Sequence, residues 1–206
     1  MADKYAGFSE LAQQEIADKD FSLRCTRRLG VPAVIAPHGG GIEPGTSELA
    51  EAIAGNDLSF YAFEGKKAAG NGDLHITSTR FDEPRCLELL AASPTCIAMH
   101  GEGTQNREAV FLGGLNHVIR DRIAVSLKHA GFIAEIHGDP MLQGCAPSNV
   151  CNRCVSRRGV QLEVSAGLRR SFFLDLSTKQ GREGRTQPFE EFVHTVREAI
   201  LRPDGI

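Results

Sequence analysis

The sequence predicts an α/β fold in which a mixed or largely parallel sheet is flanked by helices. Short apolar runs that are typical of buried strands alternate with longer segments that carry apolar residues at helical spacing. No repeat, low-complexity tract or linker interrupts this alternation. The length of 206 residues suits one domain with a sizeable core, so we expect a single domain over residues 1–206.

In the first half of the chain, helices are expected where polar residues that can cap a helix precede an apolar pattern. Residues 46–54 are an example, because Thr46 can cap the helix, Glu48 suits its positive end and Gly55 can end it. Ser9 and Asp82 are possible caps of two further helices. The expected helices are 8–17, 46–54 and 82–92. The expected strands are 33–36, 58–63, 74–78 and 95–99.

In the second half, residues 115–130 carry the longest helical pattern, which Gly131 can close. A loop rich in glycine, proline and cysteine is expected over residues 137–154. The remaining expected elements are strands 132–136 and 159–164 and an amphipathic helix, 188–201. In open α/β sheets, ligands gather beyond the carboxyl ends of the strands. His38, His100 and His137 all follow expected strands, which places a candidate site at that edge.

Composition excludes several classes of function. A net charge of −3 argues against binding of bulk nucleic acid, and the absence of Trp with only 2 Tyr argues against a platform for stacking single strands. No apolar run approaches the length of a membrane span, and the polar N-terminus does not resemble a signal peptide. We therefore expect a cytoplasmic protein that binds neither nucleic acid nor membrane, and we expect a monomer.

The segment His38-Gly39-Gly40-Gly41-Ile42-Glu43 is the first candidate for chemistry. Imidazole and carboxylate are suitable zinc ligands, and the glycines allow the chain to turn back so that both side chains reach one ion. His100 ends a second expected strand and precedes another glycine-containing loop. Two histidines and one carboxylate, with a fourth position open for water, form the pattern of a catalytic zinc site.

Other interpretations of these residues remain open at this point. A histidine after a strand is often a loop residue with an ordinary hydrogen bond, and a glycine-rich turn can hold a phosphate. The His-Gly-Gly-Gly string also resembles the oxyanion loop of lipases and esterases. That interpretation requires a Gly-x-Ser-x-Gly elbow, and residues 163–167, Glu-Val-Ser-Ala-Gly, lack its first glycine.

Several motifs together resemble the poly-gamma-glutamate hydrolase family, whose members are small zinc enzymes often encoded by phages or phage-derived genes. The resemblance extends roughly over residues 33–170. The motifs, in order, are His38-Gly-Gly-Gly-Ile-Glu-Pro-Gly-Thr46, His75-Ile-Thr-Ser-Thr-Arg-Phe-Asp-Glu-Pro84, Met99-His-Gly101, Cys151-Asn-Arg153 and Gly159-Val-Gln-Leu-Glu-Val-Ser165.

The resemblance implies a fold like that of zinc carboxypeptidases and hydrolysis of the amide between the side-chain carboxyl of one glutamate and the amino group of the next. It implies one zinc ion with His38, Glu43 and His100 as ligands, and it makes Glu163 the catalytic carboxylate. Alternation along the strand independently places Glu163 on the face opposite Leu162. The alternative is a surface glutamate on an edge strand.

A polymer with one free carboxylate per residue requires cations in its binding site, and arginine binds carboxylates through two parallel hydrogen bonds. We expect Arg153 and Arg169 to bind these carboxylates. Asn152 is expected to assist, because zinc carboxypeptidases use a similar Asn-Arg pair. His75 is expected to contact substrate or support the metal shell. The alternatives are surface arginines exposed to solvent and a core histidine.

The cysteines permit more than one interpretation. Cys145, Cys151 and Cys154 form a Cys-x5-Cys-x2-Cys cluster that suits a disulfide, a reversible thiol pair or three free thiols. Cys25, Cys86 and Cys96 are interpreted as small core residues. The rival functions are a zinc amidase or deacylase acting on a small N-acyl amino acid, and a non-catalytic phage-derived binding protein. If the gene is phage-derived, lysis of the host cell would release the protein.

Overall fold

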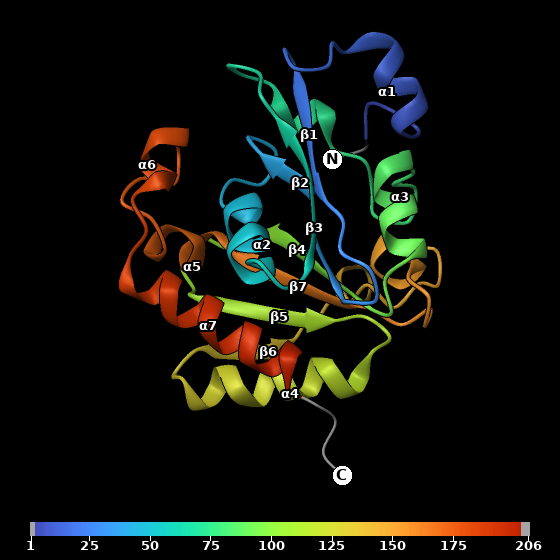
Figure 1. Cartoon of the computed structure of the whole chain (residues 1–206). Coiled ribbons are helices and arrows are strands. Elements are labelled where there is room, and N and C mark those ends of the chain that lie inside the picture. Colours follow the sequence, from blue (N-terminus) through green and yellow to red (C-terminus); the bar gives the residue numbers. More distant parts are fainter. Residues whose placement is uncertain (1–2, 203–206) are drawn as a thin grey trace.

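The computed structural model describes residues 3–202, so the ends of the expected domain, residues 1–2 and 203–206, lie outside the described part. Its centre is a seven-stranded sheet with the order β1-β3-β2-β4-β7-β5-β6 (Figure 1). The pairs β1–β3 and β5–β7 are antiparallel and the other neighbouring pairs are parallel, which confirms the expected fold class. The strands are β1 (Phe21–Thr26), β2 (Ala33–Gly40), β3 (Ser59–Gly65), β4 (Cys96–Glu102), β5 (Ala109–Gly113), β6 (Ile133–Ile136) and β7 (Val160–Ser165).

Helices cover both faces of the sheet (Figure 1). One buried apolar cluster lies between the sheet and α2, α4 and α7, and a second lies between the opposite face and α1 and α3. Val34 belongs to the first cluster and Ile35 to the second, so β2 is buried on both faces. The α-helices are α1 (Phe8–Gln14), α2 (Thr46–Ala54), α3 (Pro84–Ala91), α4 (His117–His129), α5 (Ala166–Ser171), α6 (Lys179–Glu183) and α7 (Gln187–Leu201). The 3-10 helices are η1 (Asn71–Leu74), η2 (Pro140–Leu142) and η3 (Val150–Arg153).

No helix within residues 3–202 has the length and apolar character that crossing a membrane requires.

The central strands continue further than the sequence predicts. Strand β2 passes through Pro37 and reaches Gly40, so His38 lies within the strand and not after it. Its pairing with β3 shifts register between Ala36 and Gly39, which is consistent with the missing N–H group of Pro37. Strand β4 likewise includes His100. Both histidines are therefore held by the sheet itself.

Strands β1 and β5 and helices α5 and α6 are not among the sequence predictions. Strand β1 is half-exposed along most of its length, and β5 has only 5 residues, so neither shows a long apolar or alternating pattern. Both take part in antiparallel pairs, and they make the sheet mixed. Helices α5 and α6 are too short, at 6 and 5 residues, to show a helical period.

The strand expected over residues 74–78 is wrong. Residues 71–74 form the helix η1, and the chain that follows joins no strand. Leu74 and Ile76 are nevertheless buried in the core, so an irregular segment produces the alternation that suggested a strand. This irregular course leaves the carbonyl of Ile76 free to accept a hydrogen bond from His38 Nε2 (2.8 Å).

The expected helix caps also differ. Glu83, and not Asp82, caps α3, and its carboxylate accepts hydrogen bonds from the main-chain N–H groups of Arg85 and Cys86. Asp82 instead accepts from the N–H of Phe8 (2.6 Å) and so joins α1 to the segment before α3. The residues before α1 and α2 are glycines without a side-chain cap.

Candidate metal centre and active site

The structure brings His38, Glu43 and His100 together. His38 Nδ1 lies 3.1 Å from Glu43 Oε1 and 3.2 Å from His100 Nδ1, and His100 Nδ1 lies 3.7 Å from Glu43 Oε2. Ligand atoms of one tetrahedral zinc ion, each about 2.0–2.2 Å from it, lie roughly 3.3–3.6 Å apart. The spacing and the donor chemistry of these three side chains therefore fit one such ion.

Contacts behind the two histidines direct their Nδ1 atoms toward this point. His38 Nε2 lies 2.8 Å from the carbonyl oxygen of Ile76, so it carries the proton and donates it, which leaves the Nδ1 lone pair free. His100 Nε2 lies 3.5 Å from the hydroxyl of Ser78. Such partners orient metal-binding imidazoles in known sites.

The loop between His38 and Glu43 needs glycine for steric reasons. The N–H of Glu43 donates to the carbonyl of His38 (2.9 Å), which closes the turn. At Gly40, φ is +62°, and a Cβ atom there would lie 2.5 Å from the carbonyl oxygen of Gly65. At Gly39, a Cβ would lie 2.2 Å from the Ser47 hydroxyl. The close packing of this loop against β3 and α2 places the Glu43 carboxylate beside His38.

His75 lies beside the same three residues. Its ring centroid is 4.0 Å from that of His38, and its Nε2 is 4.0 Å from Glu43 Oε1. Ligand atoms of His38, Glu43 and His75 all lie within 4.8 Å of one another, so this trio also has the proximity that a metal site requires. His75 Nδ1 lies 2.7 Å from Asp3 Oδ1. Asp3 thus orients His75 as Ile76 orients His38.

Glu163 faces the same cavity from β7. Its register partner across the parallel β4–β7 pair is His100, and the cavity of about 330 Å³ is lined by Glu163 together with His38, Glu43 and His100. Gln161 Nε2 donates to Glu163 Oε1 (2.9 Å), and Asn149 Nδ2 donates to Gln161 Oε1 (2.9 Å). This row of amides holds the Glu163 carboxylate in place.

The electrostatics of the cavity separate its two carboxylates. Burial raises the pKa of Glu163 to about 7, and the charge of Glu43 adds to this against the opposing charge of His100. Burial also acts to raise the pKa of Glu43, but the positive charge that His38 carries when its ring is protonated and the hydrogen bond with His100 outweigh it and hold that pKa well below its usual range. Glu43 is therefore ionised and suited to binding a metal ion, while Glu163 can exchange a proton near neutral pH.

The family model for poly-gamma-glutamate hydrolases matches residues 5–195. The chain belongs to this family. Two Bacillus subtilis (strain 168) proteins are similar to it along most of their length. The protein YndL is 37% identical over 196 residues, which cover 94% of this chain and 76% of YndL. The SPbeta prophage-derived protein YoqZ is 36% identical over 201 residues, which cover 97% of this chain and 72% of YoqZ.

Solved structures agree with this membership. A bacteriophage poly-gamma-glutamate hydrolase matches with a TM-score of 0.93 and 34% identity, over 96% of each chain. The zinc-free apo form of YndL matches with the same TM-score and identity, over 99% of this chain and 100% of the chain in that structure. An N-formylglutamate amidohydrolase from Ralstonia eutropha, 13% identical with a TM-score of 0.50, covers 89% of this chain and 96% of its own and shares the fold.

In this poly-gamma-glutamate hydrolase family member, Arg169, which was expected to bind substrate carboxylates, is not among the residues that line the cavity. Its Nε, Nη1 and Nη2 groups donate to the carbonyls of Val164 (3.0 Å), Pro44 (2.7 Å) and Glu102 (3.0 Å). The guanidinium packs directly against Gly101, where a Cβ atom would lie 2.6 Å from Cζ. Arg169 therefore joins three segments that carry site residues, which is a positioning role.

The expected contact of Asn152 with substrate needs correction. Its side chain is completely buried, and its Nδ2 group donates to the carbonyls of Gly144 (2.8 Å) and Ala146 (2.9 Å). Its Oδ1 atom accepts from the main-chain N–H of Gly159 (3.0 Å). Asn152 is occupied in joining the loop before it to the start of β7.

Arg153 is likewise separate from the candidate metal site. It lies at the end of η3, where its Nη1 donates to the carbonyl of Phe81 (3.3 Å), and it does not line the cavity that contains Glu163. The Asn-Arg motif is thus present in the sequence, but this fold turns both side chains toward main-chain groups.

The cysteines form no disulfide within the part of the chain that is described. Cys151 and Cys154 are buried in the apolar cluster beside α3, and burial raises the pKa of Cys151. Such thiols are poor nucleophiles. Cys145 is exposed, Cys86 and Cys96 are core residues as the sequence predicts, and Cys25 is half-buried.

Several residues that support the site are not among the sequence predictions. Gln161 lies two positions before Glu163 on the same face of β7, so strand alternation was a signal that could have identified it. Asn149, Ser78 and Asp3 gave no such signal, because loops bring them to the cavity from distant parts of the chain.

Proposed function

We propose that this protein hydrolyses gamma-glutamyl amide bonds of poly-gamma-glutamate, with one zinc ion held by His38, Glu43 and His100. The observation that carries the proposal is the convergence of these three side chains and Glu163 on one cavity, in a chain that belongs to the poly-gamma-glutamate hydrolase family. The zinc-free YndL structure supports zinc as the metal. A non-catalytic binding protein would have no need for this complete set.

A zinc ion bound there supplies Lewis-acid chemistry, which polarises the scissile carbonyl and acidifies the attacking water. Glu163 acts as the general base that takes the proton of the water and then delivers it to the nitrogen of the leaving amine. Burial of Glu163 acts to raise its pKa, which favours uptake of the proton from the water. Gln161 orients the Glu163 carboxylate through its hydrogen bond to Oε1.

His75 is proposed to support the metal shell and not to coordinate directly, because Asp3 engages one of its nitrogens and the other lies 4.0 Å from Glu43. His100 has the shorter contacts with His38 and Glu43. The His38–Glu43–His100 set is therefore the better assignment of ligands.

The test is incubation of the purified protein with poly-gamma-glutamate, with added zinc and separately with a chelator, followed by sizing of the products. Shortening of the polymer only with zinc supports the proposal. The matched control is Glu163→Gln under the same conditions. A small N-acyl amino acid is the comparison substrate, because the metal cavity of about 330 Å³ also suits a small amide. If only the small N-acyl amino acid is cleaved, the protein is a small-molecule amidase and not a hydrolase of the polymer.

A further inference from the structure

The metal cavity offers no side-chain cation to an anionic polymer. Its charged lining consists of Glu43, Glu102 and Glu163 beside the histidines, and no lysine or arginine within residues 3–202 lines it. Poly-gamma-glutamate carries one carboxylate per unit, and the protein has a net charge of −3. Binding of such a chain therefore requires a cationic surface next to this cavity.

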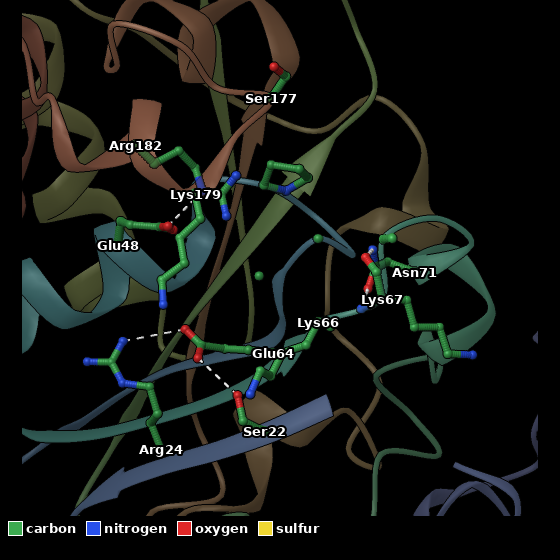
Figure 2. Close-up of a pocket in the computed structure, with 15 residues that line it drawn as sticks. Ser22, Arg24, Glu48, Glu64, Lys66, Lys67, Asn71, Ser177, Lys179 and Arg182 are labelled. Carbon is green, nitrogen blue, oxygen red and sulfur yellow. Dashed lines mark hydrogen bonds and ion pairs between the residues drawn. The ribbon is translucent and has the colours of Figure 1, made fainter. Parts of the chain in front are cut away.

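A second, larger cleft of about 550 Å³ lies on the other side of the metal-binding loop. Gly40, Gly41 and Pro44 line this cleft, while His38 and Glu43, from the same segment, line the metal cavity. Pro44, which directly follows Glu43 in the sequence, therefore lies between the cleft and the metal cavity. We call it the cationic cleft, because five basic side chains line it: Arg24, Lys66, Lys67, Lys179 and Arg182 (Figure 2).

The arginines of the cationic cleft are already paired. Arg182 Nε donates to Glu48 Oε1 (2.7 Å), and Arg24 pairs with Glu51 and, at 3.4 Å, with Glu64. Both arginines line the cleft together with their partners Glu48 and Glu64, so their charges are already balanced there.

The lysines differ in how much charge they have available. Lys67 Nζ is paired with Glu15 (2.7 Å). Lys66 Nζ donates to a main-chain carbonyl, that of Asp18 (2.7 Å), and forms no ion pair with a carboxylate of residues 3–202. Lys179 is exposed, has no hydrogen bond or ion pair with the described residues, and extends from α6 toward the Arg24–Glu64 pair in Figure 2. Lys66 and Lys179 are thus free to bind an anion.

Asn71 covers part of the cleft floor. Gly40, Gly41 and Gly65 line the cleft, but a Cβ atom at Gly41 would lie 2.5 Å from Asn71 Nδ2, and one at Gly65 would lie 2.6 Å from Asn71 Oδ1. Asn71 donates to the main-chain carbonyl of Lys67 (2.7 Å) and accepts from its N–H group (3.0 Å), which holds this side chain in place. A polymer in the cleft would therefore lie over Asn71 and not on the bare glycines.

We propose that the cationic cleft binds the carboxylates of the polymer units on one side of the scissile bond, with Lys66 and Lys179 as the principal contacts. This inference rests on the proposed function, because it assigns the cleft to the same substrate. It makes the protein selective for long anionic chains, since a gamma-glutamyl dimer that fills the metal cavity cannot extend into the cleft.

The test uses the double variant Lys66→Glu/Lys179→Glu. Its matched control is Lys128→Glu/Arg158→Glu, which changes the net charge equally at exposed positions that line neither cavity. For long poly-gamma-glutamate, the cleft variant should show a KM at least about tenfold higher than the control, with kcat nearly unchanged. For a gamma-glutamyl dimer, both variants should match the wild type. Equal KM values for the polymer in the two variants would refute the proposal.

A binding measurement separates this proposal from the proposed activity. The metal-free wild type should bind fluorescently labelled poly-gamma-glutamate, and the cleft variant should bind it at least about tenfold more weakly than the control. If the wild type binds the polymer in this way but does not cleave it with zinc, the proposed function is wrong and the cleft stands. If the wild type cleaves the polymer and both variants bind it equally, the cleft assignment is wrong. Binding of inorganic polyphosphate but not of the polymer would identify a phosphate site and overturn the assignment.

Discussion

His100 on β4 and Glu163 on β7 are register partners in the centre of the sheet, between the apolar pair Met99–Leu162 and the pair Gly101–Val164. One is a candidate metal ligand and the other the candidate base. Because both belong to paired parallel strands, the hydrogen bonds of the sheet set their separation. Two residues of the proposed chemistry are therefore held by a rigid part of the fold. Glu43, in contrast, is positioned by the loop that follows β2.

Replacing the candidate base should abolish turnover and leave metal binding intact. In Glu163→Gln, the amide cannot accept a proton, and we expect kcat to fall by about 10²–10⁴-fold. Initial rates on poly-gamma-glutamate and zinc content by atomic absorption measure the two effects. Glu102→Gln is the matched control, because Glu102 lines the same cavity but its carboxylate accepts hydrogen bonds from Thr104. Comparable rates for the two variants would show that Glu163 is not the general base.

The same variant should stabilise the metal-free protein at alkaline pH. Folding raises the pKa of Glu163 from 4.5 to about 7, so the native state binds more protons than the unfolded state between these values. The contribution of Glu163 to stability is present below pH 4.5 and is lost as pH rises through 7. Urea unfolding of the chelated proteins should show Glu163→Gln gaining about 1–3 kcal/mol over wild type between pH 4 and pH 8. A difference that does not vary with pH would contradict the raised pKa.

The roles proposed for His100 and His75 predict different zinc affinities when each residue is replaced. His100→Ala removes a proposed ligand, so stoichiometric zinc binding should be lost. His75→Ala removes a supporting contact, and zinc affinity should fall by about 10–100-fold. Titration calorimetry of the two purified variants measures both constants. The reverse order would transfer the third ligand position from His100 to His75.

Arg169 should act through the loop that carries Glu43. Arg169→Ala leaves the carbonyls of Val164, Pro44 and Glu102 without this donor, and we expect a loss of about 2–4 kcal/mol of unfolding free energy together with weaker zinc binding. Arg170→Ala is the control, since that exposed neighbour donates to the Gln105 carbonyl alone among the described residues. Wild-type zinc affinity and stability in Arg169→Ala would show that the three hydrogen bonds do not position the site.

Much of the fold could be predicted because its pattern is local. Helix α2 was predicted with its observed bounds, and α4, α7, β3, β6 and β7 within a few residues, since each has a clear apolar period or a glycine at its end. The short strand β5 and the half-exposed β1 have neither. The direction in which a short strand pairs is a property of the assembled sheet, so the antiparallel pairs could not be predicted.

The candidate site divides in the same way. The sequence pattern indicated His38, Glu43 and His100, because histidine, glycine and carboxylate in these places suit a metal. The family resemblance implied Glu163 as the catalytic carboxylate, and strand alternation set only the face of β7 on which it lies. The Asn152-Arg153 motif does not reveal where the two side chains point, since that depends on how η3 packs against loops distant in sequence. The cationic cleft was equally hidden. Lys66 and Lys179 are more than a hundred residues apart, and only the tertiary structure, in which Arg182 of α6 pairs with Glu48 of α2, brings them to one cleft.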